Sequence, residues 1–212
     1  MNQTNSNASQ VIESTNANGR IEDGMLFNGT SSYTYGTKWL GHATDAWTCG
    51  GWFWWDGNTN KSNRFLWNDG GLGAVYGWTM RIGGTDRSSL YFAISVGGAT
   101  NFGTMPVSNW VHLVVSKTNA SSDVYNIYSN GVQVVSASLT TPPNDPGNLS
   151  RIGVGWGTGY TTSYFSGMID ELFFINRGFT AADCQAHMSN TPPVLNLPGC
   201  YPGGNIRVRG TY

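Results

Sequence analysis

The chain has 212 residues, with 11 Lys or Arg against 12 Asp or Glu and a formal net charge of -1 at pH 7. All-β domains of about 200–250 residues routinely form a single unit, so one domain is expected. Charged residues make up only 11% of the chain, where about 25% is usual. This argues against recognition of nucleic acid or of an anionic membrane surface, both of which need clustered Lys and Arg.

Hydrophobic residues make up 39% of the chain, enough for a sizeable core, and no apolar run approaches the ~18 residues that span a bilayer. Residues 1–20 are polar and Asn-rich and are expected to form an arm or linker. They lack the pattern of a secretory signal. The leading Met favours a chain that is not exported by that route over one whose signal was removed before this numbering begins.

Residues 21–188 are expected to form the body of the domain, because short β-prone runs alternate there with Gly, Asn, Asp and Pro clusters. Asn130-Gly131 between two such runs predicts a tight hairpin. Turns at intervals of about 8–15 residues, without helices between them, indicate an antiparallel sandwich. The predicted strands are 25–27, 32–35, 47–55, 64–67, 75–82, 90–96, 110–117, 124–128, 132–135, 151–154 and 168–175.

One short helix is predicted near the C-terminus. Thr180 lies three residues before Asp183, a weak variant of a capping box, and the helix is expected to run to about Met188. Residues 189–212 are expected to be an irregular extension because they are rich in Pro and Gly, with one possible last edge strand at 206–209.

Three cysteines, Cys49, Cys184 and Cys200, cannot all pair within one chain, and none has the spacing of a zinc or redox motif. Three unpaired thiols are expected, with Cys49 in the core. The alternative is a Cys184–Cys200 disulfide.

Five blocks of sequence, in order, resemble a known family. They are the Phe-Asn-Gly turn at 27–29 with Tyr33, the aromatic strand at 47–52, Trp-x-His at 110–112, Tyr-x-Asn-Gly at 128–131, and Ile-Asp-Glu at 169–171. Together they resemble a laminin-G-like, concanavalin A-like jelly roll. The expected fold class is therefore all-β: an antiparallel β-sandwich with one short helix. The family includes lectins, adhesion modules, pentraxins, hydrolases and parts of virus particles, so the resemblance predicts the fold far better than the function.

The resemblance implies one structural calcium ion where the first and last strands meet. The matching residues here are Asn28 and Asp170, and an amide in place of a carboxylate should weaken such a site. The alternative is that Asp170 caps backbone amides. The two-calcium site of pentraxins is not expected, because residues 154–164 contain no acid.

Glycoside hydrolysis is not expected. It needs two carboxylates facing each other across the scissile bond, and the Glu-x-Asp-x-x-Glu pattern of jelly-roll glycosidases is absent. Asp170 and Glu171 are neighbours, and successive strand side chains point to opposite faces. The three histidines have no metalloprotease spacing, and His112 alternates with apolar residues as a structural strand residue does.

Aromatic residues carry the remaining functional signal. Trp52 and Trp54 face away from Phe53 and Trp55, so one of these two sets is a candidate for exposure. Trp67, Trp156 and Tyr160 lie in or near predicted loops. The predicted ligand-binding residues are Trp54, Trp67, Trp156 and Tyr160, with burial in the sandwich as the alternative for each.

These observations predict a non-catalytic module displayed on a surface. The leading hypothesis is a virion structural protein, such as a phage capsid decoration or fibre, with capsid or fibre proteins and sister subunits as partners and host glycans as a possible ligand. The alternative is a carbohydrate-binding or adhesion module of a secreted or cell-surface protein.

Overall fold

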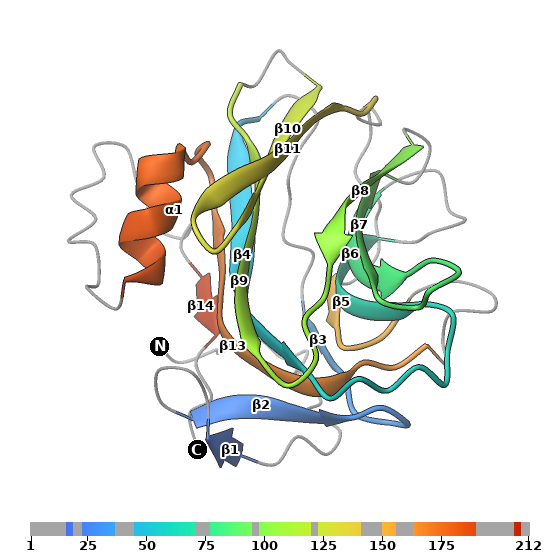
Figure 1. Cartoon of the computed structure of the whole chain (residues 1–212). Helices are drawn as coiled ribbons and strands as arrows, with labels where there is room; N and C mark the ends of the chain where they lie inside the picture. The colour runs from blue at the N-terminus through green and yellow to red at the C-terminus, as the bar shows by residue number, and fades with distance from the viewer. Residues whose placement is uncertain are drawn as a thin grey trace.

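The computed structural model describes residues 16–18, 23–36, 45–70, 77–94, 98–119, 123–140, 150–155, 163–189 and 206–208. Within these ranges the chain forms fourteen strands and one helix (Figure 1). The elements are β1 (Asn16–Asn18), β2 (Asp23–Asn28), β3 (Thr34–Gly36), β4 (Trp47–Trp55), β5 (Arg64–Gly70), β6 (Gly77–Gly83), β7 (Ser89–Ile94), β8 (Gly98–Thr104), β9 (Trp110–Lys117), β10 (Val124–Ser129), β11 (Val132–Ser138), β12 (Ser150–Ile152), β13 (Ser166–Ile175), α1 (Ala181–Met188) and β14 (Ile206–Val208).

The strands form two antiparallel sheets that face each other. One has the order β1-β2-β13-β4-β9-β10-β11, with β14 beside β13, and the other has the order β3-β12-β5-β6-β7-β8. Both sheets contribute side chains to one apolar core, as a β-sandwich requires. Figure 1 shows α1 on the side of the eight-stranded sheet that faces away from the six-stranded sheet. The predicted fold class, with one short helix near the C-terminus, is confirmed.

Most predicted strands are present, and those at 47–55 and 110–117 have the predicted ends. In the predicted hairpin, Asn130 and Gly131 have φ values of 49° and 76°, the left-handed backbone that a tight hairpin turn needs. The prediction missed β8, because its Gly, Ala and Asn residues have low β-propensity. Pairing with β7 holds β8 in the sheet instead.

Two short strands lie outside the predicted body of the domain. Residues 16–18 were expected to belong to the arm, but they form β1 and pair with β2. The predicted last strand is confirmed over Ile206–Val208, where β14 pairs with β13. The rest of the arm and of the C-terminal extension lies outside the described residues.

Strand β13 organises the eight-stranded sheet. Strand β4 pairs with one edge of β13 along nearly the whole length of β13. The other edge of β13 pairs with β2 at residues 166–169 and with β14 at residues 172–174. The register with β4 shifts between Asp170 and Phe173, and Glu171 has a φ of 47°, which marks a β-bulge.

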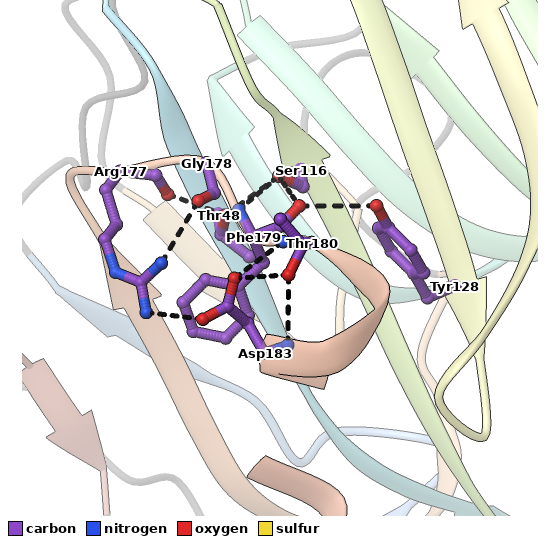
Figure 2. Close-up of polar contacts among 8 residues, drawn as sticks. All are labelled: Thr48, Ser116, Tyr128, Arg177, Gly178, Phe179, Thr180 and Asp183. Carbon is purple, nitrogen blue, oxygen red and sulfur yellow. Dashed lines mark hydrogen bonds and ion pairs between the residues drawn. The ribbon is translucent and has the colours of Figure 1, made fainter. Parts of the chain in front are cut away.

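The segment before α1 is fixed to the sheet through the backbone N–H and C=O groups of Phe179 (Figure 2). Its N–H donates to the hydroxyl oxygens of Ser116, at 2.7 Å, and Thr48, at 3.0 Å. Its carbonyl accepts from the hydroxyls of Ser116 and Tyr128. Side chains from β4, β9 and β10 therefore supply the hydrogen bonds that a buried peptide group needs.

The capping box predicted for α1 is confirmed. The Thr180 hydroxyl accepts from the N–H of Asp183, and the Asp183 carboxylate accepts from the N–H of Thr180 at 2.8 Å. Arg177 donates to the other carboxylate oxygen at 2.9 Å. This ion pair and the helix cap hold the pKa of Asp183 below its usual range, although partial burial opposes the shift.

The anchoring of Phe179 can be measured. In the double variant Thr48→Val/Ser116→Ala the buried N–H of Phe179 loses both acceptors, so we expect unfolding in urea to show a loss of about 1–3 kcal/mol. Ser136→Ala, on the exposed face of β11, is the matched control and should change stability by less than about 0.5 kcal/mol. Equal effects of the two changes would contradict the proposed anchoring.

Candidate functional site

The ladder between β4 and β9 sets four pairs of side chains on the outer face of the eight-stranded sheet. Directly paired residues of an antiparallel ladder lie on the same face, and every second residue of a strand returns to that face. The four outward pairs, in order along β4, are Thr48–Ser116, Gly50–Val114, Trp52–His112 and Trp54–Trp110. The residues between them, such as Cys49 and Phe53, belong to the core.

Helix α1 and the segment before it cover the first three pairs. A second apolar cluster lies between the helix and the sheet and consists of Val114, Tyr128, Phe173, Ile175, Phe179 and Cys184. Trp52 lies at the border of this cover, with its ring centroid 5.1 Å from that of His112, and only 5% of it is exposed.

The fourth pair is not covered in this way. Trp54 and Trp110 are both partly exposed, and the ladder extends their row to Met168 on β13 and Leu26 on β2, which are also partly exposed. Leu26, Met168, Trp54 and Trp110, from four neighbouring strands, are called the aromatic row below. It is an apolar strip with a partly exposed indole on each of two adjacent strands.

A second row on the same face contains polar groups. The next outward positions, two residues from Leu26, Met168 and Trp54, are occupied by Asn28, Ser166 and Asp56 respectively. These three residues are called the polar row. The Ser166 hydroxyl donates to the Asp56 carboxylate, whose other oxygen accepts from the N–H of Asn58 at 2.8 Å. Asp56 and Asn28 are exposed. A carboxylate has about four acceptor positions, so Asp56 retains capacity for a ligand hydroxyl.

The turn after β2 brings the polar row together. The Asn28 side-chain oxygen accepts from the backbone N–H groups of Thr30, Ser31 and Ser32 at 2.9–3.0 Å. Gly29 follows with a φ of 73°, and a Cβ atom there would lie 2.7 Å from Ser166 Cβ. Glycine is therefore required at this position both for the backbone conformation and for the close approach to β13.

The loop that carries Asp56 is held by a buried arginine. Arg64 donates to the carbonyl oxygens of Lys61 and Arg87, and its guanidinium lies 5.1 Å from the centre of the Trp55 ring. Burial lowers the pKa of Arg64 to about 10, with the nearby Arg87 as a second cause. The side chain remains charged at neutral pH and fixes the loops on both sides of it.

The four predicted ligand residues have different outcomes. Trp54 is outward and partly exposed, as a ligand contact requires. Trp67 lies in β5 with 0% exposure, and its indole N–H donates to the Ser150 hydroxyl at 3.0 Å, so its placement at an exposed loop is wrong. Trp156 and Tyr160 lie outside the described residues. The sequence prediction missed Trp110 and Asp56, because only the register shows that they adjoin Trp54 and Ser166.

The predicted calcium ligands do not meet. Asn28 is paired with Ser166, and Asp170 lies four residues further along β13, which places the two about 13 Å apart along the strand. Both side chains have local partners, since Asn28 closes its own turn and Asp170 accepts from the N–H of Glu171 at 2.7 Å. Among the described residues no group of three or more His, Cys, Asp or Glu side chains is placed to hold a metal.

The adjacent acids Asp170 and Glu171 and the described thiols are buried, whereas Asp56 is exposed. Asp170 and Glu171 are only 5% and 3% exposed. Cys49 and Cys184 are buried free thiols, so Cys184 is not in a disulfide, while Cys200 lies outside the described residues. Burial raises the pKa of both thiols, that of Cys184 to about 12. In the described part of the chain no helix is long and apolar enough to cross a membrane.

Residues 27–185 match the family model of the concanavalin A-like lectin/glucanases superfamily. The match covers most of the chain, which therefore belongs to this superfamily. No curated protein matches the chain.

Solved structures share the fold at low sequence identity. Domain 4 of AbnA, an extracellular arabinanase from Geobacillus stearothermophilus solved with arabinotriose, is 19% identical with a TM-score of 0.62, over 82% of this chain and 80% of that one. A heptameric pentraxin from Limulus polyphemus is 12% identical with a TM-score of 0.57, over 87% and 91%. A Bacteroides ovatus protein whose carbohydrate binding is inferred is 18% identical with a TM-score of 0.57, over 76% of this chain but only 45% of its own.

The surface position of the aromatic row predicts a contrast in stability. Trp54→Ala and Trp110→Ala should each cost about 1–3 kcal/mol, because part of each removed ring is solvated. Trp52→Ala should cost about 3–5 kcal/mol, because this ring is buried against His112. Urea unfolding of the three variants checks the contrast, and equal losses for Trp54 and Trp52 would show that Trp54 is a packing residue.

Proposed function

We propose that this chain is a non-catalytic carbohydrate-binding module and that the aromatic row, with the polar row beside it, is its sugar site. The observation that carries the proposal is the outward placement of Trp54 and Trp110 on adjacent strands. An apolar patch rimmed by polar groups marks an interaction site on a soluble protein. A sugar ring offers an apolar face for the indoles and hydroxyls for the polar row.

The chemistry of the surface favours a neutral ligand. The polar row has a single carboxylate, Asp56, which can accept hydrogen bonds from sugar hydroxyls. Its other two members, Asn28 and Ser166, are neutral groups that hold the turn and the Asp56 side chain in place. The chain as a whole has 11% charged residues. Electrostatic attraction therefore contributes little, and affinity depends on ring stacking and directed hydrogen bonds.

The structural relatives support the proposal by analogy of fold only. The arabinanase domain was solved with arabinotriose, and a sialidase from Trypanosoma rangeli has a similar domain over 28% of its length. Such domains occur within enzymes as well as in binding proteins, and a fold does not determine a function. The burial of Asp170 and Glu171 favours binding over catalysis in this chain.

The more specific proposal concerns where the module acts. In this proposal the chain is a capsid decoration or fibre protein on a virion surface, where it contacts capsid or fibre proteins and sister subunits. This location is compatible with a site that binds host glycans. A neutral surface rich in Asn, Ser, Thr and Gly supports display outside a cell or on a particle. Detection of the chain in purified virus particles would favour this location over a secreted or cell-surface adhesion protein.

The sugar site is tested with a panel of neutral oligosaccharides and polysaccharides, including arabinan, followed by calorimetry on the ligands that bind. Trp54→Ala and Trp110→Ala should each weaken binding at least about tenfold, as loss of a central aromatic contact does. Tyr91→Ala removes a partly exposed ring from the other sheet and serves as the matched control. Binding that survives both Trp variants, or no binding across the panel, would overturn the proposal.

A further inference from the structure

A buried pair of histidines joins the last turn of α1 to the sheet. His112 on β9 and His187 on α1 approach with Nε2 and Nδ1 3.2 Å apart, and the side chains are 0% and 8% exposed. Aromatic rings surround the pair. Measured between ring centroids, Phe173 lies 4.0 Å and Phe179 6.3 Å from His187. The Trp52 centroid lies 5.1 Å from that of His112. This contact fixes the C-terminal end of the helix, whereas the Phe179 peptide and the capping box fix its beginning.

The hydrogen bonds of the pair restrict where its protons can lie. His112 Nδ1 is buried without a hydrogen-bond partner. A neutral imidazole has one donor and one acceptor nitrogen, and a buried bare acceptor costs less than a buried bare donor. The favoured arrangement therefore has His112 Nε2–H donating to His187 Nδ1, with an unprotonated His112 Nδ1.

Protonation of either ring places a proton at that same buried atom. If His112 gains the proton, its Nδ1 becomes an N–H without an acceptor. If His187 gains it, both nitrogens of His187 carry protons, so His112 must accept at Nε2 and carry its own proton on Nδ1. Either route leaves an unpartnered buried donor next to a positive charge, and both are costly in an apolar setting.

The charged and titratable groups nearby have partners or are buried in neutral form. On α1, Asp183 pairs with Arg177 and with the helix cap, and Cys184 is a buried neutral thiol. On β10, Tyr128 donates to Phe179, and its pKa is raised, chiefly by burial. On β13, Asp170 lies in the same row as His112 but beyond Trp52, and it accepts from the N–H of Glu171. Burial, with His187 as the second cause, lowers the pKa of His112 to about 3.

We propose that acid releases the C-terminal part of α1 from the sheet by protonating the His112–His187 pair, and that this release weakens the sugar site beside it. The first step stands on the geometry of the pair alone, while the second rests on the proposed function. Trp52 connects the two, because it packs against His112 and is the next outward residue along β4 from Trp54. When the helix leaves, His112 loses its contact with His187, so this pair no longer fixes the position of Trp52 beside the aromatic row.

The direction of the pH effect follows from proton linkage. In the unfolded chain His112 titrates near its ordinary value of 6.5, but in the folded chain it stays neutral down to about pH 3. The unfolded state therefore binds the extra proton, and the contribution of the pair to stability is complete above about pH 6.5 and is lost as the pH falls below it. The equilibrium constant for unfolding, or for helix release, should rise by up to about tenfold per pH unit for each such proton.

The test compares the wild-type chain with His112→Leu/His187→Leu at about pH 7.5 and about pH 5. Hydrogen exchange should show faster exchange in α1 than in β9 on acidification of the wild type. The double variant should lose this response, because its apolar pair has no proton to gain. His42→Gln, at the third histidine, is the matched control and should respond like the wild type. A response that persists in the double variant would overturn the first step.

The sugar affinity of the same proteins separates the two steps. Wild-type affinity for a ligand identified from the neutral panel should fall at about pH 5 in proportion to the fraction of molecules with α1 released, and the double variant should keep its affinity. If helix release is seen but no sugar binds at either pH, the proposed function fails and the first step stands. If sugar binds equally at both pH values while α1 is released, the coupling is overturned and the sugar site stands.

If the double variant does not fold, a measurement on the wild type alone still tests the proposal. Proton NMR of the imidazole rings should show that His112 does not titrate near pH 6.5 in the folded protein. Titration of His112 near that value would overturn the proposal.

Discussion

The structure depends most on the antiparallel register between β4 and β9. This one ladder aligns the hydroxyls that anchor the Phe179 peptide, the Trp52–His112 pair under the helix, and the outward Trp54–Trp110 pair. A slip of one residue would turn every one of these side chains toward the core and bring Cys49 and Phe53 to the surface. The aromatic core on the inner face of the sheet therefore fixes the position of the aromatic row on the outer face.

The low charge of the chain determines how its helix is attached. With few ionic groups, the chain satisfies a buried peptide with Thr, Ser and Tyr hydroxyls, and it adds one ion pair, Arg177–Asp183, at the helix start. At the other end of α1 the helix is joined to the sheet by a contact between two neutral histidines and not by an ion pair. Attachment by neutral groups is insensitive to salt but is sensitive to any proton that creates a buried charge. The same composition leaves the proposed sugar site nearly neutral.

Local patterns were sufficient to predict much of the fold. Trp47–Trp55 and Trp110–Lys117 are rich in aromatic or β-branched residues. Asn130-Gly131 favours a tight turn through its backbone conformation, and the Thr180 hydroxyl caps a helix, both without distant partners. Strand β8 lacks such preferences and exists because β7 pairs with it. Alternation along β4 correctly made Trp54 a candidate for the surface, but it could not show that Trp52, on the same face, is buried against His112.

The parts of the site that sequence reasoning missed depend on contacts between segments that are distant in the sequence. Trp110 joins Trp54 only through the β4–β9 register, and His187 meets His112 across 75 residues of chain. Asn28 and Asp170 lie on adjacent strands, as the resemblance implied, yet the register separates them along the strand direction. Trp67 precedes a turn-like Asn-Asp-Gly, but β5 continues through those residues and buries its ring.

The central claim is that the outer face of the eight-stranded sheet holds the sugar. An NMR titration with an oligosaccharide from the neutral panel tests it most directly, because each indole N–H gives its own signal. If the sugar binds on this face, the signals of Trp54 and Trp110 will shift with added sugar, while those of the core residues Trp67 and Trp78 will stay in place. Shifts confined to the six-stranded sheet, for example at Arg81 and Tyr91, with Trp54 and Trp110 unmoved, would contradict it.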